Sequence, residues 1–240
     1  GLAALPAAAR MKPLSLAVII PARQEAQRLP LLLADLQQAP LGLETELIVV
    51  DSSADQGTAD VAQLAGAQVI RCAANRGLQL QVGIAAATSP WLLLLHADCR
   101  LPARWGASVE QAMGQAPAAW YFDFQVAAAG LPLRLLELAV QLRCRIRALP
   151  YGDQGLLLPR ALLEQAGGMR PLPLMEDLDL VQRLHPLAPL RRLGQPLAVD
   201  GRRWRRDGVL RTAERNAALR RSWRRGATAQ ELAQRYYRSP

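Results

Sequence analysis

The sequence predicts an α/β fold with a mostly parallel central sheet and helices on both faces. Short, continuously apolar segments alternate with segments of helix length, which is typical of a parallel sheet that is covered on both sides. The chain has 240 residues, of which 51% are hydrophobic and 20% charged. It is therefore long enough to bury a full core. This composition excludes a disordered chain, a collagen-like fibre and a disulfide scaffold.

The first half of the chain supplies most of the predicted strands. Each strand candidate is a short apolar run, and each intervening segment has the spacing or composition of a helix. In chain order we expect strand 15–20 (ended by Pro21), helix 26–39, strand 46–51, helix 58–65, strand 68–71, helix 78–87 and strand 91–95. The second half is more mixed, with strand 120–127, helix 131–149, strand 155–158, helix 175–184 and basic helical segments from 209 onward.

The positive charge lies in a C-terminal tail. The chain carries 29 Lys and Arg residues against 20 acids, a formal net charge of +9, and the segment 202–240 alone holds 12 arginines and three acids. The rest of the chain is therefore neutral. The tail points to a phosphate, an anionic membrane surface or a nucleic acid as its neighbour, and a solvated helical face remains the alternative.

The cysteines and the apolar segments indicate the cellular compartment of the chain. Cys72, Cys99 and Cys144 are far apart and form no Cys-x-x-Cys pair, so neither a zinc site nor a disulfide framework is indicated. A reducing cytoplasm fits this pattern. No run of about 18 apolar residues occurs, so we expect no spanning helix.

Acidic residues follow three of the predicted strands. Glu25 lies in the loop after the first strand, Asp51 ends the second, and Asp98 follows the fourth. Ligands in open α/β sheets bind beyond the carboxyl ends of the strands, so the three carboxylates should gather around one crevice. Asp98 and His96, two residues apart in an extended segment, could hold a divalent cation, and helix capping by Asp98 is the alternative. Asp51 stands where a carboxylate commonly accepts hydrogen bonds from a ribose or base.

A second acidic cluster begins the predicted helix 175–184. Glu176, Asp177 and Asp179 suit the positive end of the helix dipole, which is the structural explanation. In the functional one, a single carboxylate of the Glu176–Asp177 pair faces the crevice as a general base, because neighbouring side chains are about 100° apart on a helix. Two glycines flank Asp153 and Gln154 in a tight loop that displays their polar side chains, although a plain turn predicts the same residues.

The arginine cluster 202–206 surrounds Trp204. Arginine can grip a diphosphate with two hydrogen bonds, and tryptophan can stack on a ring.

In this order, the segments resemble the family-2 inverting glycosyltransferases of the GT-A fold. VIIPARQEAQRLP (18–30), ELIVVDSSADQGT (46–58), the triplet Asn75-Arg76-Gly77, the HAD of 96–98 and the Glu176–Asp177 pair stand where that family has its opening, VVDDGSTDGT, N-x-G, D-x-D and E-D motifs. The resemblance covers roughly residues 15–206. The strings HADCRLP, PYGDQG, PLMED and RRWRRDG resemble a narrower branch of small bacterial transferases predicted beside radical-SAM and selenium-related genes.

The resemblance implies a role for each matching residue. Pro21, Ala22, Glu25, Asp51 and Arg76 would bind the nucleotide. Asp98, with His96 as a second contact, would coordinate Mg²⁺ or Mn²⁺. Asp177 would be the catalytic base. Asp153, Gln154, Glu176, Arg203 and Trp204 would lie near the diphosphate or the acceptor.

Three positions depart from the family pattern. Gln24 replaces an Asn, Ser52 replaces the second Asp of the nucleotide loop, and His96 replaces the first Asp of the metal motif. The metal would then be held mainly by Asp98 and phosphate oxygens. The donor base, uridine or guanosine, stays open.

The resemblance also implies a domain organisation. Residues 1–14 would be an extension, with Met11 as a candidate natural start. Residues 15–206 would form a GT-A-like transferase domain, with a nucleotide-binding half (15–102) and an acceptor half (103–206). Residues 207–240 would be a basic helical tail. The enzyme would be cytoplasmic, with the tail in peripheral contact with the inner membrane surface.

The predicted reaction moves a sugar from a UDP- or GDP-linked donor to an acceptor hydroxyl of unknown identity, with inversion. Two other classes remain as alternatives. A nucleotidyltransferase that makes a nucleotide-sugar would want a glycine-rich loop after the first strand, and residues 21–25 contain no glycine. A non-catalytic nucleotide- or nucleic-acid-binding protein fits the arginine tail, but the converging acids of a neutral body oppose a polyanion, which makes nucleic acid a poor partner.

Overall fold

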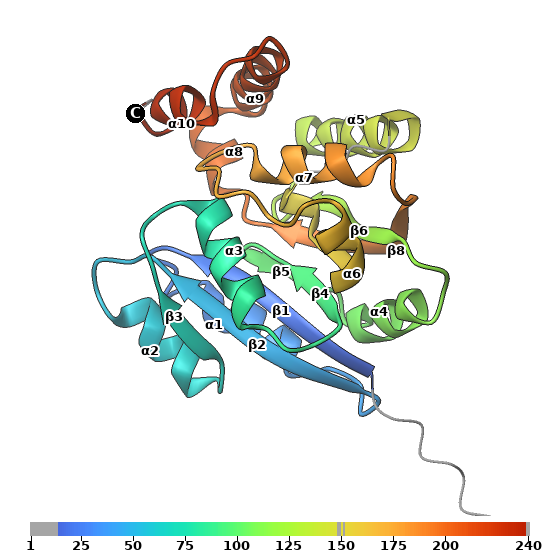
Figure 1. Ribbon diagram of the computed structural model, residues 1–240. Coiled ribbons are helices and arrows are strands. Elements are labelled where there is room, and N and C mark those ends of the chain that lie inside the picture. Colours follow the sequence, from blue (N-terminus) through green and yellow to red (C-terminus); the bar gives the residue numbers. More distant parts are fainter. Residues whose placement is uncertain (1–13, 148–149, 151, 239–240) are drawn as a thin grey trace, which may run out of the picture.

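The computed structural model describes residues 14–147, 150 and 152–238 (Figure 1). Its first half contains β1 (Leu14–Ala22), α1 (Leu29–Leu36), β2 (Leu43–Asp51), α2 (Gly57–Leu64), β3 (Gln68–Arg71), α3 (Arg76–Ala86), β4 (Trp91–Leu94), β5 (Cys99–Arg100) and α4 (Trp105–Met113). Its second half contains β6 (Ala119–Val126), α5 (Leu131–Arg147), the 3₁₀ turn η1 (Gly152–Gln154), β7 (Leu156–Pro159), α6 (Arg160–Gln165), α7 (Glu176–Leu184), β8 (Leu190–Val199), α8 (Arg202–Asp207), α9 (Val209–Arg224) and α10 (Ala229–Arg238).

One sheet runs through the molecule in the order β3-β2-β1-β4-β7-β6-β8-β5. The pairs β3–β2, β2–β1, β1–β4 and β6–β8 are parallel, whereas β7 is antiparallel to both of its neighbours and β5 is antiparallel to β8. The predicted α/β class with a mostly parallel sheet is therefore confirmed. The predicted halves 15–102 and 103–206 share this single sheet.

Both faces of the sheet are buried, because β1 alternates its side chains between two apolar clusters. Leu16, Val18 and Ile20 pack with α1, α2 and α4 on one face. Ala17 and Ile19 pack with α3, α6 and α7 on the other face. This double burial explains why the strands appear in the sequence as uninterrupted apolar runs rather than as alternating ones.

Two prolines change the predicted boundaries at the N-terminal end of the fold. Pro21 does not end β1, which continues to Ala22 and pairs with β2 at that level. On its other side β4 reaches only Leu94, opposite Ile19, so the missing N–H of Pro21 falls beyond that ladder. Helix α1 begins at Leu29 rather than at residue 26, because Pro30 is tolerated only in the first turn of a helix.

The C-terminal helices α8, α9 and α10 lie at one end of the molecule, near α7 and α5 (Figure 1). Leu219, Leu232 and Ala233 from α9 and α10 form a small apolar cluster with Leu174 and Leu178, which flank the start of α7. Helices α9 and α10 therefore pack on the sheet domain through this cluster. In the described part of the chain, no helix is long and apolar enough to cross a membrane.

Candidate functional site

A cavity of about 920 Å³ lies beyond the carboxyl ends of the parallel strands. The ends of β1 and β4 form its floor through Pro21, Ala22 and the loop 96–98. The start of α3, the start of α7 and the C-terminal helices α8, α9 and α10 contribute its walls. A cavity of this size and position is the expected ligand site of an open α/β sheet.

Asp98, His96 and Glu25 line this cavity together. The Glu25 carboxylate accepts a hydrogen bond from Arg28 Nε at 2.7 Å. Burial raises the pKa of Glu25, the Arg28 guanidinium lowers it, and the negative charge of Asp98 raises it further, with a net upward shift. The carboxylates of Glu25 and Asp98 therefore repel one another. A cation bound beside them, together with a ligand, would reduce that repulsion.

The donor set fits a divalent cation that is shared with a substrate. In the described part of the chain, no group of three or more His, Cys, Asp or Glu side chains could hold a metal by itself. Asp98 and His96 offer a carboxylate and an imidazole to the cavity. Mg²⁺ is commonly held by only one or two carboxylates, with substrate phosphates and waters completing its shell. The residues present are therefore compatible with a metal that arrives with a diphosphate.

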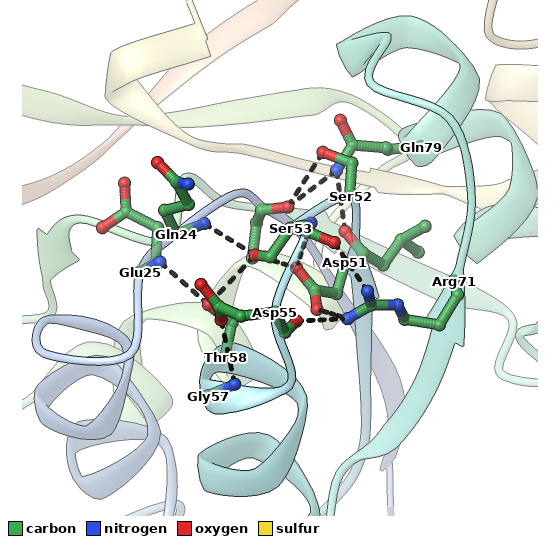
Figure 2. A network of polar contacts seen from close by, with 12 residues as sticks. Gln24, Glu25, Asp51, Ser52, Ser53, Asp55, Gly57, Thr58, Arg71 and Gln79 are labelled. Carbon is green, nitrogen blue, oxygen red and sulfur yellow. Dashed lines mark hydrogen bonds and ion pairs between the residues drawn. The ribbon is translucent and has the colours of Figure 1, made fainter.

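Asp51, the third strand-end acid, is fully buried and does not line the cavity. Its carboxylate accepts hydrogen bonds from the N–H and the hydroxyl of Ser53, at 2.9 and 2.5 Å, and forms an ion pair with Arg71. Figure 2 shows the Asp51 carboxylate enclosed by Arg71 and the loop that follows β2, whereas the Glu25 carboxylate points away from this network. Arg71 reaches Asp51 because the two residues are register partners on β3 and β2.

The Asp51 network instead shapes the cavity floor. Ser53 Oγ accepts a hydrogen bond from Gln24 N at 2.7 Å, which ties the loop after β2 to the loop after β1. Gln24 has a φ of 55°, in the left-handed region. Gln79 of α3 donates to Ala22 O at 3.0 Å and to the carbonyl of Val50 at 2.8 Å, so it holds the ends of β1 and β2 together. Ser52 is the residue of this loop that lines the cavity.

The side chains of Glu176 and Asp177 point in different directions, as helical spacing requires. Glu176 is 1% exposed and forms an ion pair with Arg76 at the start of α3. Burial raises the pKa of Glu176 and Arg76 lowers it, with a net upward shift. Asp177 lines the cavity, and its Oδ1 accepts the N–H of Leu178 at 2.8 Å. Arg76 therefore both borders the cavity and anchors α7.

Met175, just before this pair, has a φ of 66°. Among the described residues it and Gln24 are the non-glycine residues with positive φ, and both lie beside the cavity. Left-handed backbone at ordinary residues costs energy and clusters at functional sites. Here it turns the chain sharply at the residue before α7, and Asp177, the second residue of that helix, lines the cavity.

Asp153 and Gln154 occupy different environments in η1. Asp153 lines the cavity, and its buried Oδ1 accepts no hydrogen bond from the described residues. Burial raises the pKa of Asp153 to about 6, the Arg143 charge lowers it and the Asp177 charge raises it. Gln154 is 1% exposed, lies outside the cavity lining, and donates to Phe122 O at 3.1 Å. It therefore fixes η1 to β6.

Trp204 lines the cavity from α8 and makes an edge-to-face contact with Phe124, with ring centroids 6.4 Å apart. The side chain of Arg203 lies outside the described part of the structure. The neighbouring Arg202 lines the cavity and pairs with Asp200 at 2.6 Å. The arginine cluster therefore contributes to the site, and Arg202 is a lining residue that the sequence analysis did not single out.

The wall formed by α9 and α10 was also not identified from the sequence. It presents mostly polar and aromatic side chains to the cavity: Asn216, Leu219, Arg220, Gln230, Ala233, Gln234, Tyr236 and Tyr237. The signal for it was the helical spacing of Leu232 and Tyr236 within the basic tail, four residues apart, which predicts one face packed against the body of the domain.

Comparison with known proteins identifies the class. Residues 17–128, which include strands from β1 to β6, match the family described as Glycosyl transferase family 2. The match covers just under half of the chain, and over this segment the resemblance predicted from the sequence is confirmed. No protein of curated function matches the chain.

Several solved structures have the same fold. The structure of residues 1–349 of TarS from S. aureus is 17% identical, with a TM-score of 0.57, over 78% of this chain and 58% of that one. The structure of the same TarS fragment in complex with UDP-GlcNAc is 18% identical, with a TM-score of 0.61, over 79% of this chain and 59% of that one. The structure of glucosyl-3-phosphoglycerate synthase from Mycobacterium tuberculosis, in complex with Mn²⁺, UDP and phosphoglyceric acid, is 20% identical, with a TM-score of 0.54. The match covers 75% of this chain and 69% of that one. The chain thus spans little more than half of the TarS structures.

Proposed function

We propose that this chain is an inverting glycosyltransferase that moves a sugar from a nucleoside-diphosphate donor to an acceptor hydroxyl. The observation that carries the proposal is that Asp98, after β4, and Asp177, at the start of α7, line one cavity of a family-2 domain. One carboxylate is suited to the diphosphate end of the donor and the other to the acceptor. The family match favours this function over a nucleotidyltransferase or a non-catalytic binding protein.

The nucleotide would lie on the floor formed by Pro21, Ala22 and Ser52, with Glu25 beside it. Asp51 would act by holding the Ser52 loop in place through its bonds to the next residue. UDP is the favoured donor nucleotide, because the TarS and glucosyl-3-phosphoglycerate synthase structures were solved with UDP or UDP-GlcNAc.

Asp98 and His96 would hold Mg²⁺ or Mn²⁺, as suggested by the Mn²⁺ and Mg²⁺ of the synthase structures. The bound cation would supply Lewis-acid stabilisation of the charge on the departing diphosphate. Arg202, with Arg203 and Trp204 beside it in α8, would border the same phosphate and acceptor region. Guanidinium groups placed there stabilise negative charge that develops in the transition state.

Asp177 would accept the proton of the acceptor hydroxyl. The freed oxygen attacks the anomeric carbon of the donor as the bond from that carbon to the diphosphate oxygen breaks, which inverts the configuration. The proton remains on Asp177, and the electron pair of the broken bond leaves with the nucleoside diphosphate. Glu176, paired with Arg76, keeps α7 in the orientation that turns Asp177 toward the cavity.

Asp153 would bind the acceptor. Its buried Oδ1 has room for a hydrogen bond that the described residues do not supply. An acceptor hydroxyl is a donor of the required kind.

Two further predictions remain proposals. We propose a cytoplasmic location, which the absence of any disulfide among Cys72, Cys99 and Cys144 supports. We also propose that the basic segment 207–240 contacts an anionic membrane surface, because the net positive charge of the chain resides in its C-terminal residues.

The decisive experiment is a calorimetric titration of UDP and of GDP, each with and without Mn²⁺. Metal-dependent binding of one nucleotide, weakened at least tenfold in Asp98→Ala, is the expected result and identifies the donor base. Asp60→Asn, on the exposed side of α2, is the matched control and should bind like the wild type. Failure of both nucleotides to bind under every metal condition would refute the proposal.

A further inference from the structure

The outer face of α5 is apolar and exposed. Leu131, Leu135, Leu138 and Leu142 are 72%, 58%, 61% and 56% exposed. At 100° and 1.5 Å per residue, their spacing places them within an arc of roughly 60° along about 16 Å of helix. We refer to these four leucines as the leucine ridge.

The inner face of the same helix is apolar as well. Leu133, Leu136 and Val140 pack against Phe124 and Val126 of β6. The packing of α5 on the sheet therefore does not use the leucine ridge. A surface helix normally carries charged residues on its outward face, and four exposed leucines in one arc depart from that pattern.

Polar side chains do little to interrupt the ridge. The neighbouring Arg134 donates hydrogen bonds to Glu137 Oε2 at 2.6 Å and to Ala128 O at 2.7 Å, so its guanidinium is held by nearby residues. Glu137 is itself held by the N–H of Val126 at 2.8 Å. An exposed apolar strip of this length, on a helix whose inner face is already packed, indicates an interaction surface.

The helices beside α5 belong to a strongly basic segment. Helix α9 packs beside α5, and α8 packs on α9, so the three helices gather at one end of the molecule (Figure 1). Segment 202–240 carries 12 arginines against three acids. Several of its arginines on α8, on α9 and directly after α9 are exposed: Arg205, Arg206, Arg211, Arg221, Arg224 and Arg225.

We propose that the leucine ridge of α5 and the arginines of α8 and α9 form a docking surface for an anionic lipid bilayer. The leucines would enter the boundary between headgroups and acyl chains, while the arginines would bind the lipid phosphates. Stable anchoring requires two signals of this kind, since charge alone gives weak, salt-sensitive attachment.

Charge decides between a bilayer and a second copy of this chain as the occupant. A symmetric dimer through α5 would bring the basic α9 helices of both copies near the same interface, and like charges there oppose association. An anionic lipid surface complements the same charges. This inference does not depend on the transferase activity, because it can be tested by binding alone.

The test is co-sedimentation of the full chain with vesicles of phosphatidylcholine containing 30 mol% phosphatidylglycerol, and with pure phosphatidylcholine vesicles. The wild type should bind the anionic vesicles at least tenfold more tightly than the neutral ones, and 0.5 M NaCl should weaken binding strongly. The double variant Leu135→Gln/Leu138→Gln should lose at least tenfold in affinity for the anionic vesicles. Both leucines lie outside the packed face of α5, so thermal unfolding should be nearly unchanged.

The matched control is Leu41→Gln/Leu64→Gln, which removes two leucines that are fully or largely exposed elsewhere on the surface. It should bind anionic vesicles like the wild type. Absence of wild-type binding to anionic vesicles, or equal loss in both double variants, would overturn the proposal. A dimer detected by light scattering that dissociates in Leu135→Gln/Leu138→Gln would also overturn it, because a second copy would then cover the ridge.

Discussion

Replacing Asp153 with Asn should change the pH dependence of stability in a way that the structure allows us to calculate. Burial raises the pKa of this carboxyl to about 6, against 3.8 for an ordinary Asp. The folded state therefore binds more protons than the unfolded state between these values, so stability from this group increases as the pH falls through 6. From pH 8 to pH 5 the gain is about 1.4 kcal/mol.

The Asn variant has no ionisable group at this position, so only the wild type gains this stability at low pH. Relative to the wild type, the free energy of unfolding of Asp153→Asn should therefore be about 1.4 kcal/mol higher at pH 8 than at pH 5. Urea unfolding at the two pH values, with EDTA present, measures both differences, and the pH effects of groups that do not interact with Asp153 cancel. The exposed Asp60→Asn is the control and should give the same difference at both pH values. An unchanged difference for Asp153→Asn would refute the assignment of a buried, charge-disfavouring site.

Three further predictions follow from the site and the packing around it. Asp177→Asn should lower transfer roughly 10²- to 10⁴-fold, the usual contribution of a general base, while calorimetry still detects donor binding; retained transfer would remove Asp177 from that role. Arg76→Met should cost roughly 3–5 kcal/mol in urea unfolding by leaving Glu176 buried without its partner, and adding Glu176→Leu should recover much of the loss. Gly77→Ala should cost about 1–3 kcal/mol, because a Cβ there would meet loop backbone, whereas Gly114→Ala, with its nearest such contact at 3.6 Å, should change stability by less than about 0.5 kcal/mol.

The sequence predicts those parts of the fold whose local pattern and tertiary role agree. Strands β1, β2 and β4 are continuous apolar runs because both faces of the sheet are covered, so their pattern was readable. Strand β8 (Leu190–Val199) was missed, because it contains two arginines, a glycine and a proline and lies near the edge of the sheet. Helix α4 was missed because Trp105 and Val109 give a short, weak period.

The site divides in the same manner. Asp98 and Asp177 were identified because they follow a strand and begin a helix, and both positions are visible in the sequence. The burial of Asp51 was not predictable, since it depends on the register that sets Arg71 of β3 opposite it. The wall from α9 and α10 depends on long-range packing against Leu174 and Leu178, which no local pattern specifies.

The strand order has a consequence for synthesis of the chain. β4 is flanked by β1 on one side and by β7 on the other, and about 65 residues separate Leu94 from Pro159 at the far end of β7. Until the ribosome has delivered β7, the apolar WLLL strand has an open edge, and an open apolar edge can pair with another chain. At 5–20 residues per second this interval lasts roughly 3–13 s. Nascent chains that stall between β4 and β7 should therefore be the species that aggregate or recruit chaperones.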